Sequence, residues 1–336
     1  MSARETLRVA VVQHPPVLLH REETLARGAN LIAEAAAGGA RLVSFPETWV
    51  PGYPEWLWRL RPGVDAGLTA EIHGRLLENA VDLEAGALQP VQEAAHRHGV
   101  TVAMGVNERD GAYSRGTLYN TAVLVGPDGS LLNRHRKLMP TNPERMVWGL
   151  GDASGLRVVE TPAGRVGTLI CWENYMPLAR FALYAQGPEL YVAPTWDAGS
   201  GWVSTMRHIA LEGRCWVLGN GTAMRGQDVP EDFPGRDMLF PDQDDWFNPG
   251  DSVIVSPEGQ IVAGPLREEH GILFADCDPG LAHTARRTLD VAGHYARPDV
   301  FRLEVRNDSR PPVVLASLDP GTGLRSTPVS EQLPER

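Results

Sequence analysis

The sequence predicts an α/β fold built on a large buried sheet. Short apolar runs of strand length at residues 7–13 and 41–45 flank a stretch with helical spacing at 21–37, so the chain opens as β-α-β. Similar strand-length runs recur, with helical stretches between them, as far as residue 276. A chain of 336 residues that is 43% hydrophobic and 22% charged is long enough for one large α/β domain or two medium ones.

The first half continues this alternation. An aromatic, proline-rich segment at 49–58 could line a pocket or bind another subunit. The turn at 126–129 predicts a hairpin between the strands on either side of it. The remaining elements that we expect in this half are helices at 69–81 and 88–98 and strands at 101–108, 118–125 and 131–134.

The second half is predicted to repeat the pattern. A small apolar run at 166–170 predicts a buried strand, and Pro177 suits the first turn of a helix that runs over 178–185. A hairpin over 252–263 echoes residues 123–132, a weak internal repeat that suggests two related halves. The other expected elements are strands at 190–193, 215–220 and 271–276, a helix at 202–213, an irregular insertion at 224–250, and a polar tail from about 278.

Charge and cysteine usage exclude several classes of function. A net charge of −11 argues against a general nucleic-acid or anionic-membrane surface, which would need a basic patch. We expect no membrane span and no signal peptide, hence a cytoplasmic location. The three cysteines are far apart, with no Cys-x-x-Cys pair, and the histidines form no His-Glu-x-x-His motif. A disulfide framework, a metal site and a cofactor are therefore not expected.

Cys171 is the first candidate for chemistry, because it follows the strand at 166–170 and precedes a helix. Helix-start N–H groups and the positive helix end would favour a thiolate there. The alternative is that Cys171 is a small buried apolar residue, as most free cysteines are.

Glu47 and Lys137 follow other predicted strands. A carboxylate at the carboxyl end of a buried strand lies where open α/β sheets bind ligands, although Glu47 could equally be a surface residue. Lys137 could be solvated. If it lies beside a thiol and carboxylates, it becomes a fixed positive charge that stabilises developing anions.

The order Phe-Pro-Glu47, His-Arg-Lys137 and Cys171-Trp-Glu resembles the nitrilase (carbon–nitrogen hydrolase) superfamily, whose catalytic set is Glu, Lys and Cys in this order. The resemblance covers nearly the whole chain, and segments 135–145, 171–178 and 293–299 resemble the true nitrilase branch. Asn174 departs from the His found there in many microbial nitrilases, which bears on substrate preference.

The resemblance implies a four-layer α-β-β-α sandwich in one domain, residues 1–303, followed by an extended or partly disordered tail at 304–336. It further implies a homodimer building block that assembles into a spiral or helical oligomer, with no nucleic-acid or membrane partner. Segments 49–61 and 224–248 and the tail are where we expect the added subunit contacts.

The resemblance also implies the reaction, which is hydrolysis of a small-molecule organic nitrile to a carboxylic acid and ammonia. Cys171 would form the covalent intermediate, Glu47 would act as general base, and Lys137 would stabilise the anionic centre. Glu144 matches the family's second glutamate and would orient Lys137 or water; a surface salt bridge is its alternative.

Pocket contacts are expected from segments beside the catalytic ones, and aromatic lining would suit an aryl or arylalkyl nitrile. The residues that we expect to contact substrate are Tyr53, Trp172, Asn174 and Trp196. The tryptophans could instead pack the domain. Alternative functions are a cyanide dihydratase, an amidase of the same superfamily, and a filament-forming scaffold without catalysis.

Overall fold

The computed structural model describes residues 6–307, 313–319 and 323–328, and two mixed β-sheets organise them. The first sheet has the order β13-β1-β2-β3-β4-β5. Its strands are β1 (Leu7–Gln13), β2 (Ala40–Ser44), β3 (Thr101–Arg109), β4 (Leu118–Val125), β5 (Leu131–Arg136) and β13 (Gly271–Cys277). The second sheet has the order β10-β11-β9-β8-β7-β6, and β12 pairs with β11. Its strands are β6 (Val159–Thr161), β7 (Gly164–Thr168), β8 (Leu190–Thr195), β9 (Trp216–Gly221), β10 (Ala223–Met224), β11 (Asn248–Val255) and β12 (Ile261–Arg267).

The helices connect these strands. The α-helices are α1 (Arg21–Ala37), α2 (Ala66–Asn79), α3 (Gln89–His98), α4 (Pro177–Tyr184), α5 (Ser200–Gly213), α6 (Arg236–Leu239) and α7 (Pro279–Arg286). Short 3-10 helices lie in the loops of the described part of the chain, namely η1 (Glu55–Trp58), η2 (Asn142–Met146), η3 (Ala153–Gly155), η4 (Cys171–Tyr175) and η5 (Gly226–Asp228).

The two sheets share a plan. In the first, β1, β2 and β3 are parallel and the β4–β5 hairpin continues the sheet. In the second, β7, β8 and β9 are parallel and the β11–β12 hairpin follows. The two turns that resemble one another in sequence therefore close equivalent hairpins.

Side-chain alternation along the central strands separates the layers. In β1, Val9 and Val11 belong to a core that also contains Val192 of β8 and Leu218 of β9, so this core lies between the two sheets. The intervening Ala10 belongs to a second core, under α1 and α3. Because successive side chains of a strand point to opposite faces, each sheet is covered on both sides.

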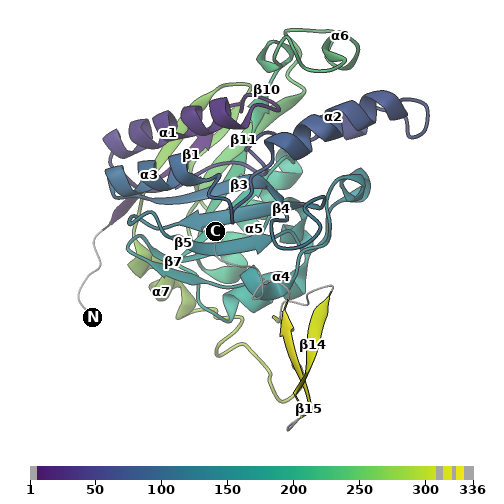
Figure 1. Ribbon diagram of the computed structural model, residues 1–336. Helices are drawn as coiled ribbons and strands as arrows, with labels where there is room; N and C mark the ends of the chain where they lie inside the picture. Colours follow the sequence, from purple (N-terminus) through teal and green to yellow (C-terminus); the bar gives the residue numbers. More distant parts are fainter. Residues whose placement is uncertain (1–5, 308–312, 320–322, 329–336) are drawn as a thin grey trace.

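The outer layers are helical. Leu25 and Ile32 lie on the apolar face of α1 and pack, together with α3, against the first sheet. Met206 and Ile209 of α5 pack with α4 against the outer face of the second sheet. Figure 1 shows α1 and α3 together along one side of the strands and α4 on the opposite side. The fold is thus the four-layer α-β-β-α sandwich that the resemblance implied.

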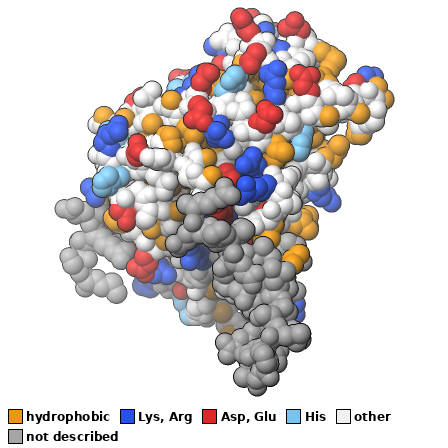
Figure 2. All heavy atoms as spheres, viewed as in Figure 1, with side chains coloured by type: hydrophobic (Ala, Val, Ile, Leu, Met, Phe, Trp, Pro, Cys, Tyr) orange, Lys and Arg blue, Asp and Glu red, His pale blue; other side chains and the backbone are white. Residues whose placement is uncertain are grey.

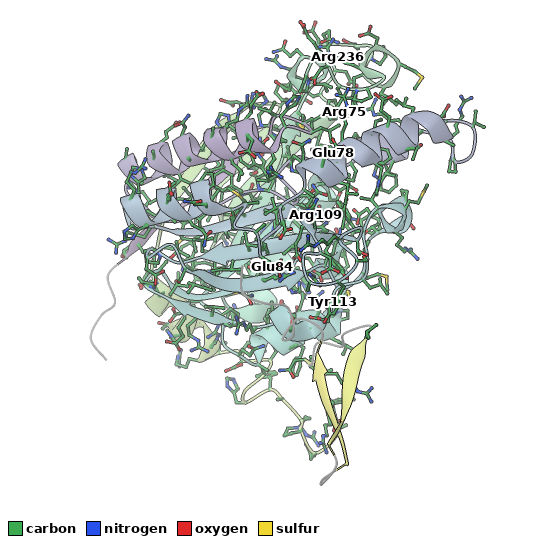
Figure 3. All side chains as sticks on the ribbon, viewed as in Figure 1. Arg75, Glu78, Glu84, Arg109, Tyr113 and Arg236 are labelled. Carbon is green, nitrogen blue, oxygen red and sulfur yellow. The ribbon has the colours of Figure 1, made fainter. Side chains whose placement is uncertain are left out.

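A smaller apolar cluster covers one end of the sandwich. It joins η1 and α2 to the 224–248 insertion, and Ile72 of α2 packs there with Phe233 and Phe240. Arg75 of α2 also donates to the Asp232 carbonyl at 2.7 Å, and Figure 3 shows Arg75 and Arg236 at this same end. The insertion that we predicted as irregular, residues 224–250, contains η5 and α6, and the strands β10 and β11 overlap its two ends.

The region after residue 277 differs in part from its prediction. A polar tail was expected from about 278, yet Pro279–Arg286 forms α7, which Asp278 caps by accepting from the Gly280 N–H at 2.7 Å. Within residues 304–336, β14 (Val314–Asp319) pairs with β15 (Gly323–Pro328) in an antiparallel hairpin. The domain boundary near residue 303 stays a prediction, and residues 308–312, 320–322 and 329–336 of the expected tail lie outside the described residues.

Figure 2 shows acidic and basic side chains intermixed over the face in view. Among the described residues, no helix is both long and apolar enough to cross a membrane.

Candidate active site

Loops that follow β2, β5 and β7 bring Glu47, Lys137 and Cys171 to one end of the sandwich, and η2 adds Glu144. The turn after β2 packs directly on β3, because a Cβ at Gly105 would lie 2.2 Å from the Pro46 carbonyl oxygen. All four side chains are almost fully buried. The structure therefore brings the four predicted catalytic residues together.

Lys137 lies at the centre of a buried charge cluster. Its Nζ donates to Glu47 Oε1 at 2.7 Å and to Glu144 Oε2 at 2.8 Å. Both carboxylates have further donors: Asn120 Nδ2 and the Trp196 backbone N–H each reach Glu47 at 2.7 Å, and the Tyr53 hydroxyl reaches Glu144 at 2.7 Å. The surface salt bridge considered for Glu144 does not describe this buried position.

The pKa directions follow from this burial. Burial raises the pKa of Glu47, and Lys137 opposes the shift without cancelling it. Burial alone would lower the pKa of Lys137, but Glu47 and Glu144 outweigh it and hold the pKa above its ordinary value. Lys137 therefore stays an ammonium, and Glu47 binds a proton more readily than an exposed glutamate.

The surroundings of Cys171 disfavour the thiolate that its position before a helix was expected to favour. Burial raises the pKa of the Cys171 thiol, and the Glu47 carboxylate raises it further. Lys137 and a hydrogen bond from the Thr195 hydroxyl act in the opposite direction and do not compensate. Helix-start N–H groups were expected to favour the anion, but desolvation dominates at this site.

The turn that presents Cys171 is held by Glu173. Cys171 has φ of 49°, in the left-handed region that side chains other than glycine rarely adopt. The buried Glu173 carboxylate accepts from Ile170 N at 2.6 Å, from Leu138 N at 2.7 Å and from His135 Nε2 at 2.9 Å. Burial raises the pKa of Glu173, but these contacts outweigh it and lower the pKa overall. The carboxylate thus ties the loops after β5 and β7 together.

A cavity of about 210 Å³ opens onto Cys171. Its walls are aromatic, since the Tyr53 and Trp196 rings stack with centroids 4.6 Å apart and planes 6° apart. The lining residues are Tyr53, Trp58, Thr141, Glu144, Cys171, Trp172, Trp196, Asp197, Ala198, Phe247, Asn248 and Pro249.

Three of the four predicted pocket residues, Tyr53, Trp172 and Trp196, line this cavity. Asn174 is placed differently. Its Nδ2 donates to the carbonyls of Leu169 and Cys171 at 3.0 and 2.8 Å, and its Oδ1 accepts from the Tyr191 hydroxyl at 2.7 Å. Asn174 is fully buried, and its side chain bonds to the backbone of the turn instead of facing the cavity.

Sequence reasoning missed several residues that shape the site. Asn120 and Thr195 contact the reacting groups from the middle of β4 and from the end of β8, where no motif marks them. Glu173 stands in the Cys171-Trp-Glu segment, so its identity was visible although its role was not. Among the described residues, no group of three or more His, Cys, Asp or Glu side chains is arranged to hold a metal ion.

Comparison with known proteins places this geometry in a family. The model of the family described as carbon-nitrogen hydrolase matches residues 8–287. An aliphatic nitrilase of Sinorhizobium fredii is 44% identical over 317 residues, which cover 91% of this chain and 98% of the relative. Nitrilase 3 of Arabidopsis thaliana is 40% identical, covering 92% and 89% of the two chains.

Solved structures agree on the fold. A carbon-nitrogen hydrolase from Helicobacter pylori matches with a TM-score of 0.66 at 19% identity, over 88% of this chain and 97% of that one. Nit3 of Saccharomyces cerevisiae, a member of branch 10 of the nitrilase superfamily, matches with a TM-score of 0.65 at 19% identity, over 87% and 97%. The chain therefore belongs to the carbon-nitrogen hydrolase family and, within it, to the nitrilases.

Proposed function

We propose that this protein hydrolyses an organic nitrile with two waters to a carboxylic acid and ammonia, through a covalent intermediate on Cys171. The observation that carries the proposal is a thiol at the base of an aromatic cavity, beside a buried lysine that two glutamates hold. Relatives that cover about nine-tenths of the chain are named nitrilases, which supports the same reaction.

The first step is proton transfer. With Glu47 and Glu144 ionised and Lys137 protonated, the buried cluster carries a net charge of −1. Ionising Cys171 into solvent would make that charge −2, whereas transfer of the thiol proton to Glu47 leaves it unchanged. Because added buried charge is costly, Glu47 is the acceptor that the environment favours.

The thiolate then attacks the nitrile carbon and a C–S bond forms. The nitrile nitrogen takes the proton that Glu47 received, which gives a neutral thioimidate, and the Lys137 ammonium stabilises negative charge as it develops. Glu47, again a carboxylate, removes a proton from the first water as the water oxygen bonds to the thioimidate carbon, and passes that proton to the nitrogen. The C–N bond of this tetrahedral adduct then breaks: the proton of the new hydroxyl moves through Glu47 to the departing nitrogen, so ammonia leaves and a thioester remains on Cys171. A second water, activated in the same way, releases the acid and restores the thiol.

Glu144 acts by position. Its Oε2 accepts from Lys137 Nζ and also from the Thr141 backbone N–H at 2.7 Å, while its Oε1 accepts from the Tyr53 hydroxyl. Two fixed donors besides the lysine keep this carboxylate in place. Glu144 therefore orients Lys137 toward the reacting atoms.

The cavity favours an organic nitrile over cyanide. Its volume of about 210 Å³ is far larger than a single water or cyanide needs, and stacked rings of Tyr53 and Trp196 form one wall. An aryl, arylalkyl or short aliphatic group would fill this space, whereas cyanide would leave most of it empty. Cyanide dihydratase activity and amidase activity remain the alternative functions, and an activity assay distinguishes them from nitrile hydrolysis.

We further propose a cytoplasmic enzyme without cofactor that forms homodimers and longer helical oligomers. Large apolar side chains exposed on the body of the protein, such as Leu178 and Phe301, support contacts between copies. Size-exclusion chromatography with light scattering measures the assembly directly, and a monomer at micromolar concentration would contradict this part.

The activity is tested by ammonia release from benzonitrile, phenylacetonitrile, glutaronitrile, cyanide and benzamide, with wild type beside Cys171→Ala. The proposal predicts release from organic nitriles that disappears in the variant. Release from cyanide alone or from benzamide alone would support one of the alternatives. Equal release from both proteins would remove Cys171 as the nucleophile.

A further inference from the structure

The cavity that leads to Cys171 has an acidic lining. Of its twelve lining residues, all within the described part of the chain, two are carboxylates, Glu144 and Asp197, and none is lysine or arginine. The nearby Lys137 lies between Glu47 and Glu144 and is neutralised by them. A substrate in this cavity therefore meets net negative charge and no unpaired cation along its walls.

Asp197 lines this cavity, and hydrogen bonds hold its carboxylate in place. Its Oδ2 accepts from Trp172 Nε1 at 2.9 Å, and the Trp172 side chain is half-exposed. Its Oδ1 accepts from the Ala198 N–H at 2.8 Å, and its own N–H donates to Thr195 Oγ1 at 2.8 Å.

The loop beyond Asp197 is anchored as well. The Gly199 N–H donates to Asp251 Oδ2 at 2.7 Å, and the same oxygen accepts from Arg267 at 2.6 Å. These hydrogen bonds hold the Asp197 carboxylate in place when a second negative charge approaches. The lining contains no lysine or arginine that could move to neutralise that charge.

We propose that Asp197 makes the cavity selective for nitriles without a carboxylate, so that a short aliphatic dinitrile is hydrolysed at one end only. The inference rests on the proposed nitrilase activity and deepens it. Glutaronitrile would add two waters and release one ammonia to give 4-cyanobutyrate. A second turnover would add two more waters and release a second ammonia to give glutarate, but it must first bring the new carboxylate into the cavity.

The size of the effect follows from Coulomb's law. Cys171 and Asp197 line the same cavity, so a four- or five-carbon chain with its nitrile at Cys171 extends along walls that carry the Asp197 carboxylate. If the second carboxylate comes within about 8 Å of Asp197, Coulomb repulsion at an effective dielectric constant near 20 lowers kcat/KM by at least about tenfold.

The test compares 4-cyanobutyrate with 4-cyanobutyramide, an uncharged molecule of nearly the same shape, by loss of the nitrile. Wild type should prefer the amide by at least about tenfold in kcat/KM. Glutaronitrile should yield 4-cyanobutyrate and one ammonia before any glutarate appears. A kcat/KM ratio of amide to carboxylate near one, or glutarate formed from the start of the reaction, would overturn the inference.

Asp197→Asn removes the charge but keeps an oxygen that can accept from Trp172 Nε1. The ratio of the two substrates should fall by about tenfold in this variant. The matched control is Asp237→Asn on α6, where the side chain is 99% exposed, and it should leave the ratio unchanged. An Asp197→Asn ratio equal to that of wild type would refute the assignment to Asp197.

Salt gives a second measurement that needs no variant. Raising ionic strength from about 0.01 M to about 1 M shortens the Debye length from about 30 Å to about 3 Å, so the wild-type preference should weaken. A preference that salt does not change would argue for exclusion by shape and against the charge. Failure of wild type to release ammonia from glutaronitrile at all would instead contradict the proposed function itself.

Discussion

Glu173→Gln tests the support of the Cys171 turn, because the substitution keeps the shape of the side chain and removes one acceptor oxygen. In the wild type, one carboxylate oxygen accepts from Ile170 N and His135 Nε2, and the other accepts from Leu138 N. Glutamine would turn an NH₂ group toward one of the two backbone N–H groups. That buried N–H would lose its partner.

The loss can be estimated from these bonds. An unpaired buried N–H costs about 1–3 kcal/mol, and a hydrogen bond to a charged group contributes about 1.5–3 kcal/mol. The substitution loses one such bond and leaves one N–H unpaired, so we expect the free energy of unfolding to fall by about 3–5 kcal/mol. With an unfolding entropy near 2.1 cal/mol/K per residue over 336 residues, Tm should fall by about 4–7 °C.

Urea unfolding and calorimetry measure these changes, and kcat on an accepted nitrile measures the effect on the thiol. We expect kcat to fall together with stability, because Cys171 leaves its left-handed backbone conformation when the turn relaxes. Glu160→Gln is the control, since that side chain is 77% exposed beside Arg165 and should change stability by less than about 0.5 kcal/mol. Wild-type stability and kcat in Glu173→Gln would refute the reasoning.

Four further predictions concern the charge cluster. Glu47→Gln should lower kcat/KM by about 10²–10⁴-fold in steady-state assays, since the variant has no base for the Cys171 proton. In the dependence of wild-type kcat/KM on pH, the acidic limb should have an apparent pKa above the ordinary glutamate value of about 4.3, because burial raises the pKa of Glu47 and the reaction needs its carboxylate. An apparent pKa at or below that value would contradict this prediction. Because the folded-state pKa of Glu47 is raised, the folded protein keeps a proton on Glu47 at pH values where the unfolded chain has already lost it. The contribution of Glu47 to the free energy of unfolding therefore falls as pH rises from about 4.3 through the folded pKa. Tyr53→Phe should lower kcat by about tenfold with little change in KM, because it removes the hydroxyl that holds Glu144 and keeps the stacked ring, whereas Tyr295→Phe at an exposed position should match wild type.

Local sequence patterns predicted most of the individual elements. The structure buries the apolar runs that predicted β1, β2 and β8. It also buries Leu25 and Ile32, whose spacing predicted the inner face of α1. The four layers could not be read from these patterns, because two buried sheets give the same local signals as one. Only the family resemblance implied the second sheet layer.

The candidate site was predictable to the extent that its residues end strands. Glu47 and Lys137 follow β2 and β5 in segments with recognisable motifs. The hydrogen bonds to Glu47 from Asn120 and from the Trp196 backbone depend on how strand β4 and the loops after β2 and β8 meet, and no local pattern predicts this. The protonated thiol depends on complete burial, which the position of Cys171 before a helix did not reveal.

The covalent mechanism is tested most directly by intact-protein mass spectrometry of the enzyme quenched during turnover of an accepted nitrile, followed by peptide mapping. Covalent catalysis by Cys171 predicts one adduct per chain, with the mass of the whole nitrile for the thioimidate or of its acyl group for the thioester. The adduct should map to Cys171 and not to the buried Cys215 or Cys277. Steady turnover without any adduct, or an adduct on another cysteine, would contradict the covalent mechanism at Cys171.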